Sequence, residues 1–327
     1  MPIVLEAKKR GIESKFYTFH IDKEYEKIMS INDPSCDAHP YRHYDYIKNL
    51  AKEYDFEFNI CKTDNEIEGL TFFCEKRGLS NVNKKIPKAV ITFLRDFAQS
   101  KWYENYIDKV DHVIFPSKFF AEHYGKISLK NLYLGSPKYD LEFDKEKIRE
   151  KYNIRAKKNA LIMFLETPGL DASLRKIYIY LKEMGFNLIV KGRGKQYPGK
   201  QCADDDFFRG DQYFEDDCWF PHTSMDLINI SDIVINFDST VTKECVMDDT
   251  PFINFDVKDD FFPFKFLLKY KYCENFKVYM DRNKFKDGVS RLTENDYSDE
   301  FKKCRDNHLF EKGNISGKIL DALEKYI

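Results

Sequence analysis

The sequence predicts an α/β protein made of two doubly wound domains. Apolar runs of strand length alternate with segments of helical periodicity along most of the 327 residues. This length suits two domains of roughly 150 residues, each with its own core. A charge-rich segment, residues 136–158, separates two such alternating series. We therefore expect one domain at residues 1–140 and a second at residues 141–327.

The first domain is expected to begin unusually. Residues 1–10 read as a helix that ends at Gly11, and the first strand follows at Lys15–Phe19. In an alternating fold a strand normally precedes that helix, so we expect the usual N-terminal strand to be missing. Helices are predicted at residues 41–54, 65–78, 97–111 and 117–125, and strands at residues 56–61, 88–94, 112–116 and 131–135.

The second domain repeats the alternation. Strands are predicted at residues 160–165, 186–191, 232–237 and 251–255, and helices at residues 142–154, 170–185, 224–230 and 240–247. Residues 313–327 predict a closing helix that packs back on the first domain. Such series form Rossmann-like parallel sheets, which bind ligands beyond the carboxyl ends of their strands. Two sheets facing each other would enclose a cleft.

Composition narrows the classes of function. The 53 Lys and Arg nearly balance the 55 Asp and Glu, for a net charge of -2, so no basic field indicates a nucleic-acid partner. No apolar run reaches the roughly 18 residues of a membrane span, and no secretory signal is recognisable. The eight cysteines contain no CxxC pair, which predicts reduced thiols in a cytoplasmic protein and no zinc site.

The most informative stretch is "INFDSTVTKECVMDDTPFINFD", residues 235–256. Asp238, Ser239 and Thr240 follow a predicted strand and are expected to cap the next helix. The first N–H groups of a helix carry partial positive charge and suit a phosphate, to which Ser239 and Thr240 would add hydroxyl donors. Glu244, one turn further along the same face, could accept both hydroxyls of a ribose.

A plain helix cap is the alternative for this stretch, since Ser and Thr cap many helices. Capping does not account for Glu244, because a capping-box acid lies three residues after the cap, not four. Glu244 would then be a solvated acid.

Three segments resemble GT-B-fold nucleotide-sugar enzymes, above all the CDP-glycerol glycerophosphotransferases and the UDP-N-acetylglucosamine 2-epimerases. "SDIVINFDSTVTKECVMDDTPFINFD" is similar to their nucleotide-binding segment, in which an Asp-Ser pair ends a strand. In the epimerases a Glu on the following helix holds the ribose, which the resemblance implies for Glu244. "NLYLGSPKYD" resembles the Gly-x-Pro-x-x-Asp segment that closes their first domain. "LIVKGRGK" occupies the place of a strand that ends in Lys and a His-Pro pair.

The sequence also departs from both families. Gly192-Arg193 replace the His-Pro pair of the glycerophosphotransferases, and Thr240-Val241 replace the Gly pair of the epimerase loop. The catalytic acids of the epimerases have no match in the first half. These departures leave the donor and the reaction open within the GT-B class.

Further candidates lie at the ends of other predicted strands. Lys191 and Arg193 could neutralise a diphosphate, although a solvated basic turn explains them equally well. Thr167 could add a phosphate contact, and His222 could contact a base or a phosphate or serve as a structural loop residue. In the first half, Asp96 is the candidate base for an acceptor hydroxyl and Arg95 would orient an anionic acceptor; a structural Arg–Asp pair is the alternative.

Two remaining patterns favour structural interpretations. Cys36, Asp37, His39 and His43 have metal-like spacing, yet they fall in a Pro-containing loop, so no metal is expected. Residues 261–272, "FFPFKFLLKYKY", predict a partly buried amphipathic helix, with a shallow membrane contact as the alternative.

The hypothesis from the sequence is a GT-B-type transferase. It would move a glycosyl or polyol-phosphate group from a UDP- or CDP-type donor to a hydroxyl acceptor, without a tightly bound cofactor. The resemblance implies a glycan or lipid-linked acceptor in surface-glycan synthesis, in the cytoplasm or at the inner membrane face. A nucleotide-sugar 2-epimerase and a nucleotide-sugar-binding protein without turnover are the alternatives. The sequence does not set the oligomeric state.

Overall fold

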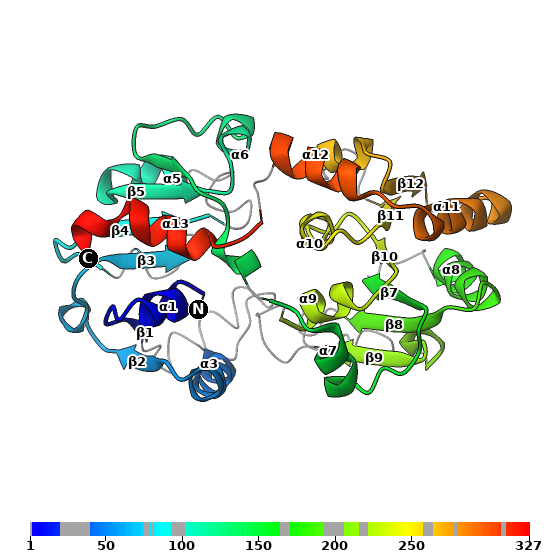
Figure 1. Ribbon diagram of the computed structural model, residues 1–327, viewed down its shortest axis with the longest axis horizontal. Helices are drawn as coiled ribbons and strands as arrows, with labels where there is room; N and C mark the ends of the chain where they lie inside the picture. Colours follow the sequence, from blue (N-terminus) through cyan, green and yellow to red (C-terminus); the bar gives the residue numbers. More distant parts are fainter. Residues whose placement is uncertain are drawn as a thin grey trace. The chain divides into compact units, whose positions relative to one another are not determined.

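A computed structural model describes residues 2–19, 40–74, 79, 82–92, 102–140, 142–163, 171–192, 206–215, 222–257, 264–277, 280–308 and 312–327. The chain divides into two compact units. The first unit comprises Met1–Glu26, His43–Glu142 and Arg305–Ile327, and the second comprises Lys27–Arg42 and Phe143–Cys304. Figure 1 shows both units with their elements labelled.

The second unit contains a six-stranded parallel sheet in the order β12-β11-β10-β7-β8-β9. Its strands are β7 (Asn159–Met163), β8 (Asn187–Gly192), β9 (Gln212–Glu215), β10 (Ile233–Asn236), β11 (Phe252–Asp256) and β12 (Cys273–Lys277). From β7 the chain first adds strands on one side and then, from β10, on the other. The sheet is therefore doubly wound, with the reversal of strand order between β7 and β10.

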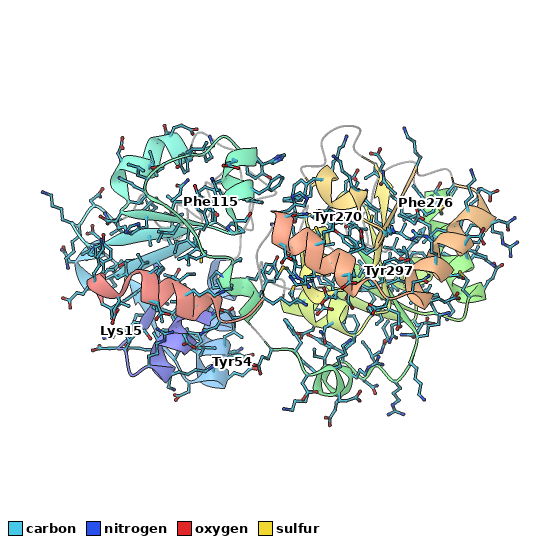
Figure 2. The ribbon with its side chains drawn as sticks, turned by 45° about the horizontal axis from the view of Figure 1, so that its top comes forward. Lys15, Tyr54, Phe115, Tyr270, Phe276 and Tyr297 are labelled. Carbon is cyan, nitrogen blue, oxygen red and sulfur yellow. The ribbon has the colours of Figure 1, made fainter. Side chains whose placement is uncertain are left out.

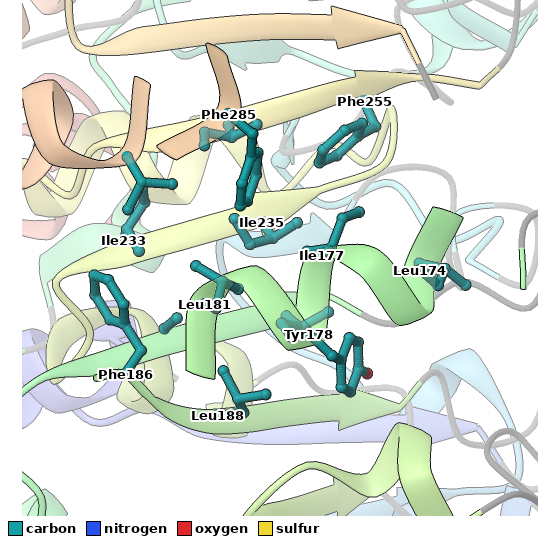
Figure 3. Packing of buried hydrophobic residues seen from close by; sticks show 14 of the residues in the cluster. Leu174, Ile177, Tyr178, Leu181, Phe186, Leu188, Ile233, Ile235, Phe255 and Phe285 are labelled. Atoms are coloured by element: carbon teal, nitrogen blue, oxygen red, sulfur yellow. The ribbon is translucent and has the colours of Figure 1, made fainter. Parts of the chain in front are cut away.

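Helices cover both faces of this sheet. On one face, α8 (Asp171–Glu183) and α11 (Arg282–Glu294) pack against the strands through a cluster that includes Ile177, Leu181, Ile235 and Phe285 (Figure 3). In Figure 1, α9 (His222–Asn229) and α10 (Thr242–Asp248) lie on the other side. Burial on both faces explains the nearly continuous apolar strand sequences.

Successive β10 residues alternate between the two faces. Ile233 and Ile235 belong to the cluster under α8 and α11. Val234 and Asn236 therefore point to the face covered by α9 and α10. Asn236 is paired in register with Asn254 of β11, which is paired with Asn275 of β12. A row of three asparagines thus crosses the face of the sheet that α10 covers.

The first unit contains two sets of parallel strands. In one, β1 (Lys15–Phe19) pairs with β2 (Glu57–Cys61); in the other, the order is β3-β4-β5-β6, with β3 (Thr71–Cys74), β4 (Lys88–Ile91), β5 (His112–Phe115) and β6 (Asn131–Tyr133). As the sequence predicts, the earliest strand among the described residues is Lys15–Phe19. Figure 2 labels Phe115, a fully buried residue of β5, and Lys15 at the start of β1.

The remaining helices are shorter on average. The first unit contains α1 (Pro2–Lys9), α5 (Trp102–Tyr106), α6 (Lys118–His123) and α13 (Ile315–Ala322), and the second contains α7 (Lys145–Lys151). Two helices include residues of both units: α3 (Pro40–Tyr54), most of which belongs to the first, and α12 (Ser298–His308), which carries the chain from the second unit into the first. Ile3 of α1 and Ile319 of α13 pack in one buried cluster with Ile91 of β4 and Ile114 of β5. The end of the sequence is therefore part of the first unit's core.

Two residues of the segment "NLYLGSPKYD" hold the start of α13. Both carboxylate oxygens of Asp140 accept backbone hydrogen bonds, from Ile315 N at 2.7 Å and from Ser316 N at 2.5 Å. Gly135 has φ +101°, and a Cβ placed on it would lie 2.7 Å from Cδ1 of Ile315. Glycine is required at this position by both its backbone conformation and this close approach.

The structure corrects three element assignments. The helix predicted at residues 65–78 is wrong: η1 (Asp64–Glu66) ends early, Gly69 has φ +70°, and β3 follows. Of the helix predicted at residues 261–272, the described part forms the short 3₁₀ turn η6 (Lys265–Lys269). The sequence interpretation also did not include β9, β12, α11 and α12.

Candidate functional site

The turn that follows β10 is built around Asp238. This residue has φ +47°, a left-handed conformation that costs a non-glycine residue free energy. Its carboxylate accepts hydrogen bonds from Asn254 Nδ2 at 2.9 Å and from Val257 N at 2.8 Å. Its own N–H donates to Asn254 Oδ1 at 3.1 Å. Asp238 therefore fixes the turn and is not a ligand group held toward solvent.

Asn254 makes every hydrogen bond that its carboxamide allows. Besides its two bonds with Asp238, Oδ1 accepts from Asn236 Nδ2 at 2.7 Å and Nδ2 donates to Asn275 Oδ1 at 2.9 Å. Two donors and two acceptor positions are the full capacity of a carboxamide. Asn236 Nδ2 also reaches the carbonyl oxygen of Ser239 at 3.4 Å. The buried asparagines thus connect directly to the turn.

Ser239 and Thr240 are the accessible part of this turn. Both are half-buried, and Ser239 Oγ accepts a hydrogen bond from Val241 N at 3.4 Å. Within the described residues, the N–H groups of Ser239 and Thr240 donate no hydrogen bond. The cap position of α10 is occupied by Val241, which makes no side-chain capping bond. The expectation that Asp238, Ser239 and Thr240 directly cap the helix is therefore wrong; they form the turn before it.

Glu244 lies in the first turn of α10 and is buried, with 6% of its surface exposed. The alternative of a solvated acid is thereby excluded. Its neighbour Lys243 is equally buried, and its ammonium lies 4.8 Å from the ring centre of Phe264. A carboxylate kept out of water needs hydrogen bonds or a paired charge to offset its lost hydration.

The end of β8 provides the second part of the candidate site. Lys191 is buried at 5% exposure, and its ammonium donates to the carbonyl oxygen of Gly192 at 2.9 Å. A Cβ on Gly192 would lie 2.0 Å from the hydroxyl oxygen of Tyr213. The hydroxyl of Tyr213 therefore already occupies the space that glycine leaves open.

Several candidate residues lie where strands of the second unit's sheet end, at the carboxyl-terminal side of the sheet. The turn with Ser239 and Thr240 follows β10, at the reversal of strand order. Lys191 is the penultimate residue of β8, on the far side of β7. Two strand spacings separate β10 from β8, about 10 Å. His222 begins α9, the helix that follows β9. Thr167, Arg193, Arg95 and Asp96 lie outside the described residues.

The described residues contain no group of three or more His, Cys, Asp or Glu suited to a metal ion. Cys36, Asp37 and His39 lie outside them. Burial raises the pKa of the thiols of Cys245 and Cys273 well above the usual value, so neither is a reactive thiolate. In the same part of the chain, no helix has the length and apolar character needed to traverse a bilayer.

Sequence comparisons find no relatives: no family model matches the chain, and no curated protein matches it. Solved structures do match. The UDP-GlcNAc 2-epimerase from Neisseria meningitidis, solved with UDP-GlcNAc bound, aligns with a TM-score of 0.61 at 13% identity over 99% of this chain and 95% of that one.

Two transferases match at similar levels. The wall teichoic acid polymerase TagF aligns with a TM-score of 0.60 at 14% identity, over 95% of this chain and 88% of that one. The glycotransferase of kitacinnamycin aligns with a TM-score of 0.56 at 9% identity, over 99% of this chain and 94% of that one. The chain therefore has the GT-B fold.

Proposed function

We propose that this protein is a transferase that moves a glycosyl or polyol-phosphate group from a nucleotide-diphosphate donor to a hydroxyl acceptor. One observation carries the proposal. The half-buried turn of Ser239 and Thr240, whose N–H groups are free of partners among the described residues, lies where the strand order reverses. In doubly wound sheets this is the place where phosphorylated ligands bind.

The diphosphate of the donor would bind along this edge of the second unit. The N–H groups and hydroxyls of Ser239 and Thr240 would donate to one phosphate. Lys191, about two strand spacings away, would neutralise the other phosphate, and Arg193 is proposed to help it stabilise the leaving group. Thr167 and His222 are proposed as further contacts to the phosphates or the base. This arrangement requires no tightly bound cofactor.

Glu244 would bind the ribose. A carboxylate can accept hydrogen bonds from two neighbouring hydroxyls at once, and Glu244 lies one short turn beyond Ser239 and Thr240. Glu244 is buried, and hydrogen bonds from ribose hydroxyls to a carboxylate kept out of water are stronger than those formed in water. The similarly folded epimerase binds UDP-GlcNAc, which favours a UDP- or CDP-type donor here.

In the proposed reaction an acceptor hydroxyl attacks the transferred carbon or phosphorus atom. Asp96 takes the hydroxyl proton, a new bond forms to the acceptor oxygen, and the bond to the donor's phosphate oxygen breaks. The leaving nucleotide keeps that electron pair, and Arg95 orients an anionic acceptor. The acceptor class that we propose is a glycan or lipid-linked glycan, with the enzyme in the cytoplasm and in peripheral contact with the membrane.

A nucleotide-sugar 2-epimerase is the second candidate. It is favoured by Glu244, whose place after the Asp-Ser pair is similar to that of the ribose-binding Glu of the epimerases. An epimerase would convert UDP-GlcNAc without any acceptor. A transferase would release nucleotide from the donor at a rate that rises with acceptor concentration.

A thermal-shift screen of UDP-, CDP-, GDP- and CMP-linked compounds tests the proposal. Ligand binding to the folded state raises the melting temperature, so one nucleotide class should raise it well above the others. The best ligand is then incubated with and without glycan acceptors, and free nucleotide and sugar isomers are quantified. Failure of every nucleotide to raise the melting temperature would contradict both candidate reactions.

A further inference from the structure

The row formed by Asn236, Asn254 and Asn275 in the second unit is hydrogen-bonded to the turn that precedes α10. Asn254 is fully buried, and it reaches Asp238 through two hydrogen bonds that run in opposite directions. Because Asp238 N must donate and its carboxylate must accept, only one orientation of the Asn254 carboxamide fits. Asn236 must then donate to Asn254 Oδ1, and the same amide group reaches Ser239 O. The orientation of one side chain therefore determines the others.

We propose that Asn254 is the positioning residue of the nucleotide site: it holds the turn of Asp238, Ser239 and Thr240 in the conformation that presents Ser239 and Thr240 to a phosphate. This rests on the proposed function. Asp238 has a left-handed backbone, which is unfavourable without support. The support comes from β11 through Asn254 and Val257. Asn254 itself does not contact the nucleotide.

An Asn254→Asp variant should break this arrangement. It removes the donor that faces Asp238 Oδ1 and places two carboxylates at the 2.9 Å distance now bridged by a hydrogen bond. Like charges at that distance cannot both remain ionised without moving apart. The turn would shift, and we expect nucleotide affinity to fall about tenfold or more.

The reciprocal exchange should restore the site. In the Asp238→Asn/Asn254→Asp double variant, the carboxylate at position 254 accepts from the backbone N–H of residue 238, from Asn236 and from the new amide at position 238. The oxygen of that new amide accepts from Val257 N. Asn275 lies at the exposed end of the row and can turn its amide to donate. Asp238→Asn alone leaves one donor facing another and should also weaken binding.

The test is calorimetric titration of parent and variants with the best nucleotide from the screen, together with melting temperatures without ligand. Asn275→Asp is the matched control: it keeps the oxygen that accepts from Asn254, so its affinity should stay within about twofold of the parent. For Asn254→Asp, affinity should recover as the pH is lowered, because a proton shared by the two carboxylates of the variant would remove their repulsion. The parent and Asn275→Asp should not show this recovery.

The possible results distinguish a failure of the positioning role from a failure of the proposed function. A purely structural role would lower the melting temperature of Asn254→Asp but leave its dissociation constant, measured well below that temperature, equal to the parent's; this would overturn the positioning role alone. A double variant that folds but binds no better than the weaker single variant would also overturn it. A parent protein that binds none of the nucleotides would overturn the proposed function and this inference together.

Discussion

At the scale of single residues, two positions with unusual backbone conformations connect segments that are separate in the sequence. Asp238 has a left-handed conformation and is held by Asn254 and Val257. Gly135 has φ +101° and lies against Ile315, 180 positions later in the chain. Both residues lie in segments through which the sequence resembles nucleotide-sugar enzymes, so the resemblance includes residues that support the fold.

We predict that Gly135→Ala lowers the free energy of unfolding by about 2 kcal/mol or more, because it adds backbone strain and a collision with a buried side chain. Gly125→Ala is the control. Its φ is +62° but a Cβ there meets nothing within 4 Å, so only the backbone cost of about 1 kcal/mol is expected. Urea denaturation of both variants measures the difference, and equal losses would contradict the contact with Ile315.

The sequence predicts Ser239, Thr240 and Glu244 as candidate site residues because strand ends and helix starts are visible locally. It placed Glu244 on a helix correctly but did not determine whether the side chain was buried. It also missed Asn254, which reads as one more residue of the apolar strand "PFINF". The importance of Asn254 depends on register with β10 and on Asp238, 16 positions away, neither of which local periodicity reveals.

At the scale of elements, α13 depends on a cap from a distant segment. Its first N–H groups are bound by Asp140, which lies 175 positions before Ile315. Unpaired N–H groups at a helix start are costly, and their loss of a carboxylate partner should be measurable.

We predict that Asp140→Ala destabilises the protein by about 1–2 kcal/mol, the usual cost of removing a helix cap. The control is Asp321→Ala, which removes an exposed carboxylate that pairs with Arg10 at 2.5 Å and should cost less than about 1 kcal/mol. Chemical denaturation of both variants measures the two losses. A loss for Asp140→Ala no larger than that of the control would show that the carboxylate does not stabilise α13.

The wrong helix prediction at residues 65–78 shows the limit of hydrophobic periodicity as a predictor of secondary structure. Residues 65–78 carry apolar side chains at spacings that fit a helix, yet the segment turns at Gly69 and continues as the short strand β3. Pairing with β4, a fully buried strand, outweighs the local preference. Four strands of the second unit, β7, β8, β10 and β11, were easier to predict, because burial on both faces makes them nearly continuous apolar runs.

At the scale of the whole molecule, the chain has the GT-B fold while sharing only 9–14% identity with the structures that it matches. Structural similarity at such low sequence identity establishes the fold but not the reaction. The function therefore has to be argued from the chemistry at the edge of the second unit's sheet. There, the claim that matters most is that a nucleotide diphosphate binds with its phosphates at Ser239 and Thr240 and its ribose at Glu244.

Calorimetric titration of the parent, Glu244→Gln and Glu294→Gln with the best nucleotide tests this claim most directly. Glu294 is an exposed acid at the end of α11 in the same unit, so it controls for the loss of one charge. Glu244→Gln keeps the side chain's shape but removes a charged hydrogen bond worth about 1.5–3 kcal/mol, and we predict roughly tenfold or greater loss of affinity. Glu294→Gln should bind like the parent. Equal affinities for the parent and a folded Glu244→Gln variant would contradict the ribose assignment, and no nucleotide binding by the parent would contradict the proposed function itself.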